Sequence, residues 1–555
     1  MSRILLLIIL VLWMARSAGH PIGQFPAPEL LTTFLGGFAL IVLFMGVWSR
    51  VLARRVTGQN LHASVARFTR AMYVARMLIP AWFGVGLFAL GWGELVETLL
   101  GPLSRWPIEL PGALLGTAPP ILAWAGLWWA QFPADRALRD QSMLVNLNED
   151  LPVHRSPGLA SFVLTNLRLQ VLFTLVPVVL ILLIRDVACV GLWRGGAIDV
   201  DPLDGSILPQ GAEVWVTLGA LAMVFLFVPE MLRHVLKTEP LPPSALRNRL
   251  EALCRRSGLR YREILLWHTD HAMGNAAVMG VLPRVRYILL SDLLVETMTD
   301  AQIEAVFAHE IGHVVHRHMT WYAVFLIIIM AGTFGPGTWI EQQLGTRVAQ
   351  GNVRELLNLM TVVTGCGGFF FLFGCLSRWF ERQADVYAAR TMQRYEDRGA
   401  LQTALSHVNV GNTVHVSVSP RPAVERFLHS TPEEKRSPAG RGETTTTAAG
   451  HVGPYGAQLF SSALHRVAVI NNIPLEREQP VNAGFFQRVG AMLDRVVERA
   501  NDWFHGSIPS RMNYLRNLSD DPKRTSDFDR SMSVLYAALL VALVASGVCL
   551  VVTVL

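Results

Sequence analysis

The order of apolar and polar stretches along this chain predicts a protein built mainly from membrane-spanning helices. A helix needs about 20 apolar residues, in a range of about 17–25, to cross the hydrocarbon core of a bilayer. The first stretch is too short to span, and Arg3 before it fits a cleaved signal peptide as well as a short first helix. Nine apolar stretches stand out, at about 4–14, 30–49, 77–93, 112–130, 169–184, 214–229, 321–340, 356–376 and 534–555.

The amino-acid composition supports a membrane protein and gives no sign of a nucleic-acid partner. Of 555 residues, 52% are hydrophobic and 16% are charged, whereas a soluble domain carries about 25% charged residues. The net charge of +6 reflects basic residues in particular loops, as membrane topology requires, and no P-loop or aromatic-basic RNA motif is present. Only three of the 48 basic residues are lysine, which is typical of a GC-rich genome and favours a bacterial inner-membrane protein.

The arginines predict which helix ends face the cytoplasm, because short cytoplasmic loops carry an excess of Lys and Arg. Alternation of the spans places residues 93–111 and 185–213 outside. The stretches 321–340 and 356–376 then form a hairpin that leaves and returns to the cytoplasmic side. The loop that fixes this orientation holds six arginines and no acidic residue: Arg50, Arg54, Arg55, Arg67, Arg70 and Arg76.

Residues 309–313 read His-Glu-Ile-Gly-His, which is the motif with the most specific chemistry in the chain. The flanking residues favour a helix and include no proline. Residues four apart share a face of a helix, so His309 and His313 can bind one zinc ion. Glu310 can then act as general base toward a metal-bound water. The motif should arise by chance on the order of 0.02 times in a chain with this histidine content.

The third ligand is expected in a second helical motif, Glu381 with Asp385, which are again four residues apart. Glu381 would bind the metal and Asp385 would accept a hydrogen bond from a ligating histidine. Taken alone, this pair fits a charged helix end after a membrane segment equally well. His316 lies about 10 Å along the helix from His309, too far to share a metal, so we expect His316 and His318 to be structural or substrate-facing. The cysteines form no CxxC pair, which argues against a thiolate site or a disulfide framework.

These two motifs, separated by two apolar segments, resemble those of the membrane-embedded gluzincin endopeptidases, which include the HtpX-like proteases and the type I CAAX prenyl proteases. Two looser matches extend the resemblance over about residues 247–515. Residues 274–280 resemble the Asn-Ala edge strand of that family, which implies that Asn275 and Ala276 align the substrate backbone. His505 and Arg511 resemble its late His-Pro…Arg element, although Gly506 stands where the family has proline.

The resemblance implies that His505 stabilises the oxyanion and that Arg511 orients the site. His429, followed by Lys435 and Arg436, offers an alternative late histidine. We prefer His505, because His429 lies in a low-complexity stretch rich in Ser, Thr and Pro, whereas the surroundings of His505 favour ordered structure.

Together these features predict a mainly α fold, a polytopic helical membrane protein with an integral zincin-type catalytic region on the cytoplasmic side. The expected segments follow in chain order. They are a signal peptide or first short membrane helix (1–29), a multi-helix membrane region (30–235), a catalytic region with edge strand and zinc helix (236–320), a transmembrane hairpin (321–376), a helix with the third ligand (377–410), a flexible low-complexity loop (411–457), a helical cytoplasmic region (458–530) and a C-terminal membrane helix (534–555).

The sequence therefore predicts a zinc metalloendopeptidase that binds one Zn²⁺ per chain and hydrolyses peptide bonds of membrane or membrane-associated proteins. We expect a role in membrane-protein quality control, with prenyl-protein processing as the alternative. A non-catalytic zinc-binding scaffold or transporter is a third interpretation. Glu310 argues against it, because metal binding alone does not require that residue.

Overall fold

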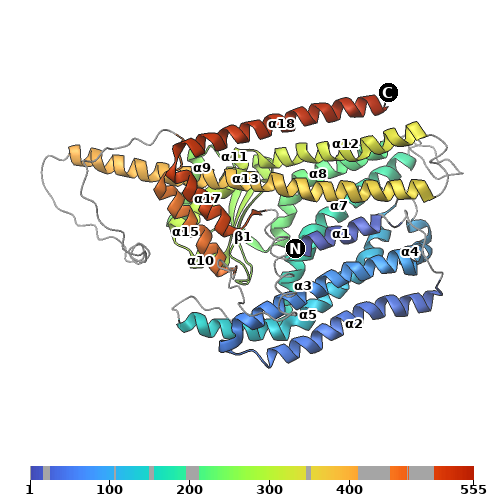
Figure 1. Cartoon of the computed structure of the whole chain (residues 1–555). Helices are drawn as coiled ribbons and strands as arrows, with labels where there is room; N and C mark the ends of the chain where they lie inside the picture. The colour runs from blue at the N-terminus through green and yellow to red at the C-terminus, as the bar shows by residue number, and fades with distance from the viewer. Residues whose placement is uncertain are drawn as a thin grey trace, which may run out of the picture.

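The computed structural model describes residues 2–14, 16, 25–104, 108–148, 156–194, 212–344, 352–409, 450–471, 473 and 505–554. Long helices run side by side through most of the molecule, and a small sheet with shorter helices lies toward one end (Figure 1). The predicted mainly helical architecture is confirmed. The alternative histidine His429 and residues 411–449 of the expected loop lie outside the described residues.

The N-terminal helices form a bundle with its own apolar core. Its elements are α1 (Ser2–Met14), α2 (Ala27–Ala53), α3 (Leu61–Val85), α4 (Trp92–Leu100) and α5 (Leu110–Asn148). The core is aromatic, because Phe34, Phe83, Trp124 and Trp128 are almost completely buried there. The chain continues through α6 (Leu159–Asn166), α7 (Phe173–Arg194) and α8 (Ala212–Val235) toward the sheet.

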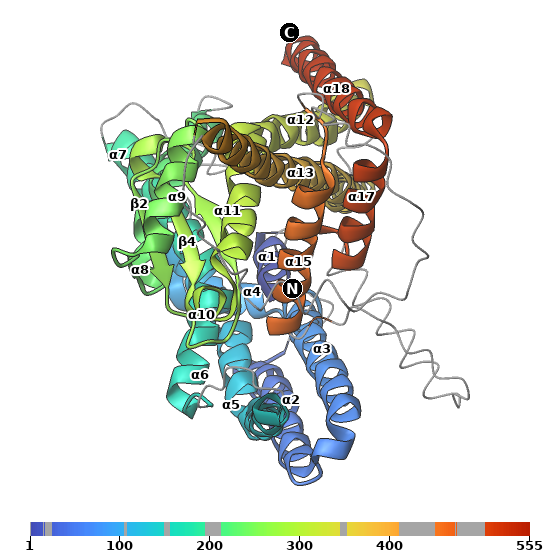
Figure 2. The same cartoon turned by 90° about the vertical axis from the view of Figure 1, so that its left-hand side faces the viewer.

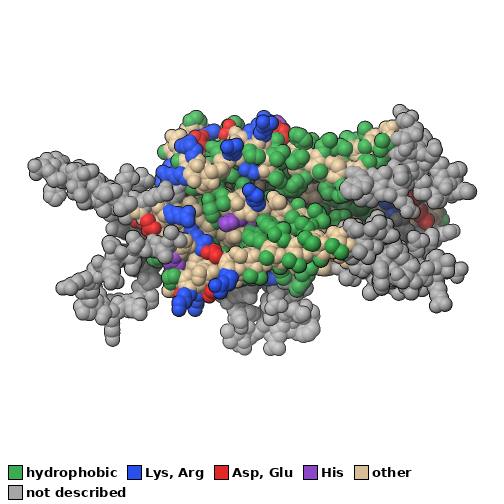
Figure 3. All heavy atoms as spheres, turned by 90° about the horizontal axis from the view of Figure 1, so that it is seen from above, with side chains coloured by type: hydrophobic (Ala, Val, Ile, Leu, Met, Phe, Trp, Pro, Cys, Tyr) green, Lys and Arg blue, Asp and Glu red, His purple; other side chains and the backbone are tan. Residues whose placement is uncertain are grey.

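Within the part of the chain that the structure describes, six helices are long and apolar enough to cross a membrane. They cover Ala27–Ala53, Ala63–Leu90, Leu110–Leu144, Leu159–Leu192, Val216–Val235 and Pro522–Val548. A seventh candidate is the pair Asp300–Val315 and His318–Gly332 taken as one span, although the two helices are bent by 47°. The first apolar helix, Leu5–Met14, is shorter than a span, as the sequence indicated. Hydrophobic side chains cover much of the helical face seen in Figure 3, and charged side chains gather toward one end.

A four-stranded mixed sheet precedes the zinc motif. Its strands are β1 (Thr238–Pro240), β2 (Glu263–Trp267), β3 (Ala276–Met279) and β4 (Tyr287–Ser291), in the order β1-β2-β4-β3. Strands β2 and β4 are parallel and the other pairs are antiparallel. All five residues of β4 are buried, so β4 anchors the sheet. Strand β3 lies at the edge of the sheet and contacts the zinc helix, and the sheet lies beside that helix in Figure 2.

The remaining helices surround this sheet and lead to the C-terminal span. They are α9 (Ala245–Arg256), α10 (Asp292–Thr297), α11 (Asp300–Val315), α12 (His318–Leu344), α13 (Asn352–Asn409), α15 (Pro454–Ile470), α17 (Ile508–Asp520) and α18 (Pro522–Val554). The sheet, α9, α11, α13, α15 and α17 share one apolar core. The helix expected to carry the third ligand is the second half of α13, a helix of 58 residues.

Candidate metal centre

Helix α11 carries the His-Glu-x-x-His motif, and its sequence fixes where it begins. The Thr299 side chain accepts from the backbone N–H of Gln302, and the Gln302 side chain accepts in return from the backbone N–H of Thr299. This reciprocal cap satisfies two backbone donors that the first turn leaves free. Ile303, Phe307 and Ile311, spaced four apart, are completely buried, so the motif is held on a helix anchored in the core.

The structure brings His309, His313 and Glu381 together. One ligand atom from each lies within 4.8 Å of the other two. The Nε2 atoms of the histidines are 3.2 Å apart, and Glu381 Oε2 lies 3.4 Å from Nε2 of His309. Two imidazole nitrogens and one carboxylate oxygen form a donor set that a catalytic zinc takes, leaving one position open. The ring of Phe460 stacks on His309, which limits access of water from the α15 side.

Gly312 explains how α11 and α13 approach closely enough to form this group. A Cβ atom at Gly312 would lie 3.1 Å from Cα of Ala384 and 3.3 Å from Cβ of Tyr387. Both neighbours lie on α13, on either side of Asp385. A larger residue would therefore push α13 away and carry Glu381 with it.

We expect Gly312→Leu to lower zinc retention and stability together. Overpacking a close contact costs about 1–3 kcal/mol, and the displaced α13 carries one of the proposed ligands. The measurement is zinc content per chain after gel filtration, with a thermal unfolding curve. Gly332→Leu is the matched control, because nothing lies within 4 Å of a Cβ at Gly332. Equal zinc content in the Gly312→Leu and parent proteins would contradict this interpretation.

A buried ion-pair network holds the first histidine and the carboxylate. Nδ1 of His309 lies 2.9 Å from Asp385 Oδ1, which leaves Nε2 for a metal. Arg511 donates from Nε to Asp385 Oδ2 at 2.8 Å, and its Nη1 lies 3.5 Å from Glu381 Oε2. Arg511 therefore offsets two carboxylates that would otherwise be buried side by side.

The pKa values of these three groups reflect the network. Burial alone would raise the pKa of Asp385, but the Arg511 charge and the hydrogen bonds from His309 and Arg511 hold it below its ordinary value. Burial also opposes ionisation of Glu381, yet hydrogen bonds from His309 and His505 keep its pKa well below its usual range. The pKa of Arg511 is raised because its two carboxylate neighbours outweigh burial. Both carboxylates are thus ionised, as metal binding requires.

His505 reaches the same group from a position three residues before the start of α17. Its Nδ1 lies 2.8 Å from Glu381 Oε1, although 69% of the side chain is exposed. Gly506 has a φ of +72°, which proline cannot adopt because its ring fixes φ near −65°. The departure from the His-Pro pattern noted in the sequence therefore has a local backbone reason.

The edge strand presents alternate backbone groups to the site. The Asn275 N–H donates to Ser291 Oγ, and the Asn275 carbonyl accepts from the Ser291 N–H. Because strand residues alternate in direction, Ala276 and Val278 point their backbone groups away from β4. Of the two residues expected to align a substrate backbone, Ala276 has its backbone groups directed away from β4, whereas the backbone of Asn275 is paired within the sheet.

Two contacts near the site were not predicted from the sequence. The side chain of Asn471, at the end of α15, accepts from the Gly274 N–H and donates to the Gly274 carbonyl, and so caps the outer edge just before β3. His318 was expected to be structural or substrate-facing, but its Nδ1 lies 2.8 Å from Nδ1 of His313. No local pattern indicates either contact. His316 lies outside the group of ligand atoms and packs against Tyr387 and His318.

Comparisons with known proteins agree with this geometry. Residues 240–445 match the family model described as Peptidase family M48. The chain is 30% identical over 207 residues to a "Protease HtpX homolog" of Aeropyrum pernix, covering 33% of this chain and 62% of that protein. It is 26% identical over 252 residues to "CAAX prenyl protease 1 homolog" of Arabidopsis thaliana, covering 40% of this chain and 56% of that protein.

One solved structure is also similar, although too loosely to support an argument. "Crystal Structure of S. mikatae Ste24p" matches with 14% identity and a TM-score of 0.39, over 87% of this chain and 98% of that one. The chain spans less than two thirds of the length of the two sequence relatives above. The family region nevertheless includes α11 and the part of α13 that carries Glu381. The resemblance seen in the sequence motifs is confirmed: residues 240–445 match the model of Peptidase family M48, within a chain that has several helices long and apolar enough to cross a membrane.

Proposed function

We propose that this protein is an integral-membrane, zinc-dependent endopeptidase that cleaves membrane or membrane-associated proteins. The observation that carries the proposal is the approach of His309, His313 and Glu381 within 4.8 Å, with Glu310 beside the first ligand. Zinc bound there would act as a Lewis acid and lower the pKa of a bound water. We propose one zinc ion per chain, since the three side chains form one group.

Glu310 is the proposed proton carrier. A general base must lie within hydrogen-bond reach of the proton that it removes, and Glu310 follows His309 directly on the same helix. Its carboxylate removes a proton from the attacking water and returns it to the leaving amine. Glu310 lies close to Val278 of β3, the strand along which a substrate would lie.

The remaining side chains orient the substrate and stabilise charge. An extended substrate would pair with the outward backbone groups of Ala276 by strand addition. His505, which is largely exposed, can turn its second ring nitrogen toward the oxyanion that forms on the scissile carbonyl. Arg511 and Asp385 hold Glu381 and His309 in place. These roles agree with those implied by the family resemblance.

The position of the site at the end of a membrane helix favours substrates anchored in lipid. Helix α11 ends at Val315, and α12 begins three residues later at His318. The scissile bond would therefore approach the metal near the bilayer surface. A folded soluble protein would first have to unfold, against a stability of about 5–15 kcal/mol. Partly unfolded membrane proteins expose extended backbone, so we propose a role in membrane-protein quality control.

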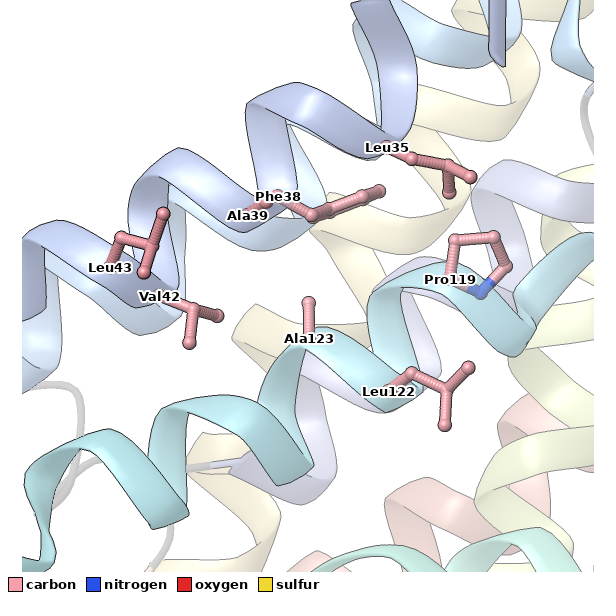
Figure 4. Close-up of a pocket in the computed structure, with 8 residues that line it drawn as sticks. All are labelled: Leu35, Phe38, Ala39, Val42, Leu43, Pro119, Leu122 and Ala123. Atoms are coloured by element: carbon pink, nitrogen blue, oxygen red, sulfur yellow. The ribbon is translucent and has the colours of Figure 1, made fainter. Parts of the chain in front are cut away.

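Prenyl-protein processing is the second candidate, and one comparison favours it: the similarity to the protein named "CAAX prenyl protease 1 homolog". Such a substrate would require an apolar pocket of farnesyl size beside the metal. An apolar pocket of about 390 Å³ does occur, but α2 and α5 line it (Figure 4). It shares no residue with the metal centre and therefore supports neither substrate class.

The deciding experiment compares two substrates of the purified enzyme in detergent. One is an unlipidated loop of a misfolded membrane protein, and the other is a prenylated CAAX peptide. We expect cleavage of the loop in the parent enzyme and no cleavage in the Glu310→Gln variant. Cleavage of the prenylated peptide alone would overturn the quality-control proposal while leaving the endopeptidase proposal intact.

We also propose that the metal centre faces the cytoplasm of a bacterial cell, since the arginine-rich stretch at residues 50–76, from the end of α2 into α3, is expected on that side. A reporter that is active only in the periplasm, fused after Arg398, should then be silent. A cytoplasmic reporter at the same position should be active. Fusions in the stretch 93–111, expected on the outside, serve as the opposite control. A strong periplasmic signal after Arg398 would reverse the proposed orientation.

A further inference from the structure

A series of four side chains in contact runs from the second histidine of the zinc motif to the C-terminal membrane helix. Nδ1 of His313 lies 2.8 Å from Nδ1 of His318, and Nε2 of His318 lies 2.8 Å from Oε1 of Gln383. The hydroxyl of Tyr536, on α18, donates to the same Gln383 oxygen at 2.6 Å. These four side chains belong to α11, α12, α13 and α18. The series of contacts therefore links all four helices beside the metal centre.

The last acceptor, the side-chain carbonyl oxygen of Gln383, determines which nitrogen carries the hydrogen on each histidine in this series of contacts. A carbonyl oxygen can only accept, so Nε2 of His318 must donate its hydrogen to Gln383. In a neutral imidazole the other nitrogen is then an acceptor, and Nδ1 of His318 must accept from His313. Nδ1 of His313 therefore carries a hydrogen, and its Nε2 carries the lone pair. That Nε2 atom faces His309 and Glu381, at 3.2 Å and 3.9 Å.

We propose that His318, Gln383 and Tyr536 are positioning residues that fix the tautomer of His313, so that α18 sets the metal-binding state of a ligand on α11. The proposal rests on the zinc site of the proposed function. At His309 the tautomer is instead fixed by Asp385, a carboxylate that is paired with Arg511. One ligand is thus held by charged groups and the other by a neutral relay that ends in a membrane helix.

Packing holds the relay in one geometry. His318 is 1% exposed, and its ring lies flat on that of Phe380, with centroids 4.3 Å apart and planes 1° from parallel. On the other side Tyr536 packs against Trp321, with ring centroids 4.6 Å apart. Because both rings are clamped, His318 cannot turn to offer a different nitrogen without losing these contacts. If one partner in this buried series of hydrogen bonds is removed, a buried polar group is left unpaired, which lowers stability.

The test measures zinc affinity by chelator competition on the full-length protein in detergent, independently of cleavage. Gln383→Met removes the acceptor and keeps the volume, which frees His318 to adopt the other tautomer. We expect its zinc dissociation constant to rise about 10–100-fold, the usual effect of losing a hydrogen-bond partner behind a ligand. Gln383→Glu keeps an acceptor for both donors and should bind zinc as the parent does. A parent-like dissociation constant in a folded Gln383→Met protein would overturn the proposal.

A milder pair of variants covers the case in which Gln383→Met fails to fold. Tyr536→Phe removes the hydroxyl that holds Gln383, and Tyr322→Phe removes a neighbouring hydroxyl that bonds only to Ser377 among the described residues. Zinc affinity should fall in the first variant and stay unchanged in the second. Equal affinities in the two variants would show that α18 has no such role. A parent protein that binds zinc but cleaves nothing would defeat the proposed function and leave this inference standing.

Discussion

Glu310→Gln should bind zinc normally, fold normally and lose almost all proteolytic activity. The substitution keeps the size and shape of the side chain but removes the group that accepts the proton. General-base catalysis contributes typically 10²–10⁴-fold to the rate, so we expect cleavage of the membrane-protein loop to fall by about that factor. His309, His313 and Glu381 are untouched, and the zinc content per chain should remain that of the parent.

The matched control for this prediction is Glu304→Gln, which removes a carboxylate from the same helix. Glu304 pairs with Arg249 on α9, on the part of α11 that precedes the motif. Its loss should alter stability slightly and leave cleavage near the parent rate. Both rates should be measured on samples of known zinc content. Undiminished proteolysis in a zinc-replete Glu310→Gln enzyme would rule out Glu310 as the base.

The sequence predicted the helices and the local motifs well because both depend on short-range periodicity. The spacing of His309 and His313, and that of Glu381 and Asp385, follows directly from the 3.6-residue turn of a helix. The cap formed by Thr299 and Gln302 was not among the predictions, although it too is a short-range pattern. What periodicity could not supply was the approach of α11 to α13. That approach depends on Gly312, whose lack of a side chain has meaning only once its neighbours on α13 are known.

The contacts that the sequence did not reveal join segments that lie far apart in the chain. Asn471 bonds to Gly274 across 197 positions, and Tyr536 bonds to Gln383 across 153. Each is a single polar residue in an otherwise unremarkable helix, so no pattern in one sequence distinguishes it from a solvated side chain. The backbone direction of Asn275 was also hidden, because alternation along a strand fixes direction only after the strand register is known.

Helix α13 carries Glu381, the third proposed ligand. Removing the Glu381 carboxylate should have the largest effect on zinc retention. Glu381→Ala deletes one of three donors and leaves Arg511 facing a single carboxylate. Two histidines alone form an incomplete zinc site, so the purified variant should retain much less than one zinc per chain and cleave nothing. Metal analysis after dialysis against a weak chelator, alongside the cleavage assay, measures both effects.

Two further variants separate loss of the ligand from damage to the helix. Glu396→Ala removes an exposed glutamate from the same helix and should keep zinc and activity. Glu381→Asp keeps the charge beside Arg511 but shortens the side chain by one methylene, which withdraws the oxygen from a group whose atoms lie within 4.8 Å. We expect it to fold as the parent does and to bind zinc weakly. Normal zinc content in Glu381→Ala would mean that another side chain completes the site, and α13 would then have only a structural role.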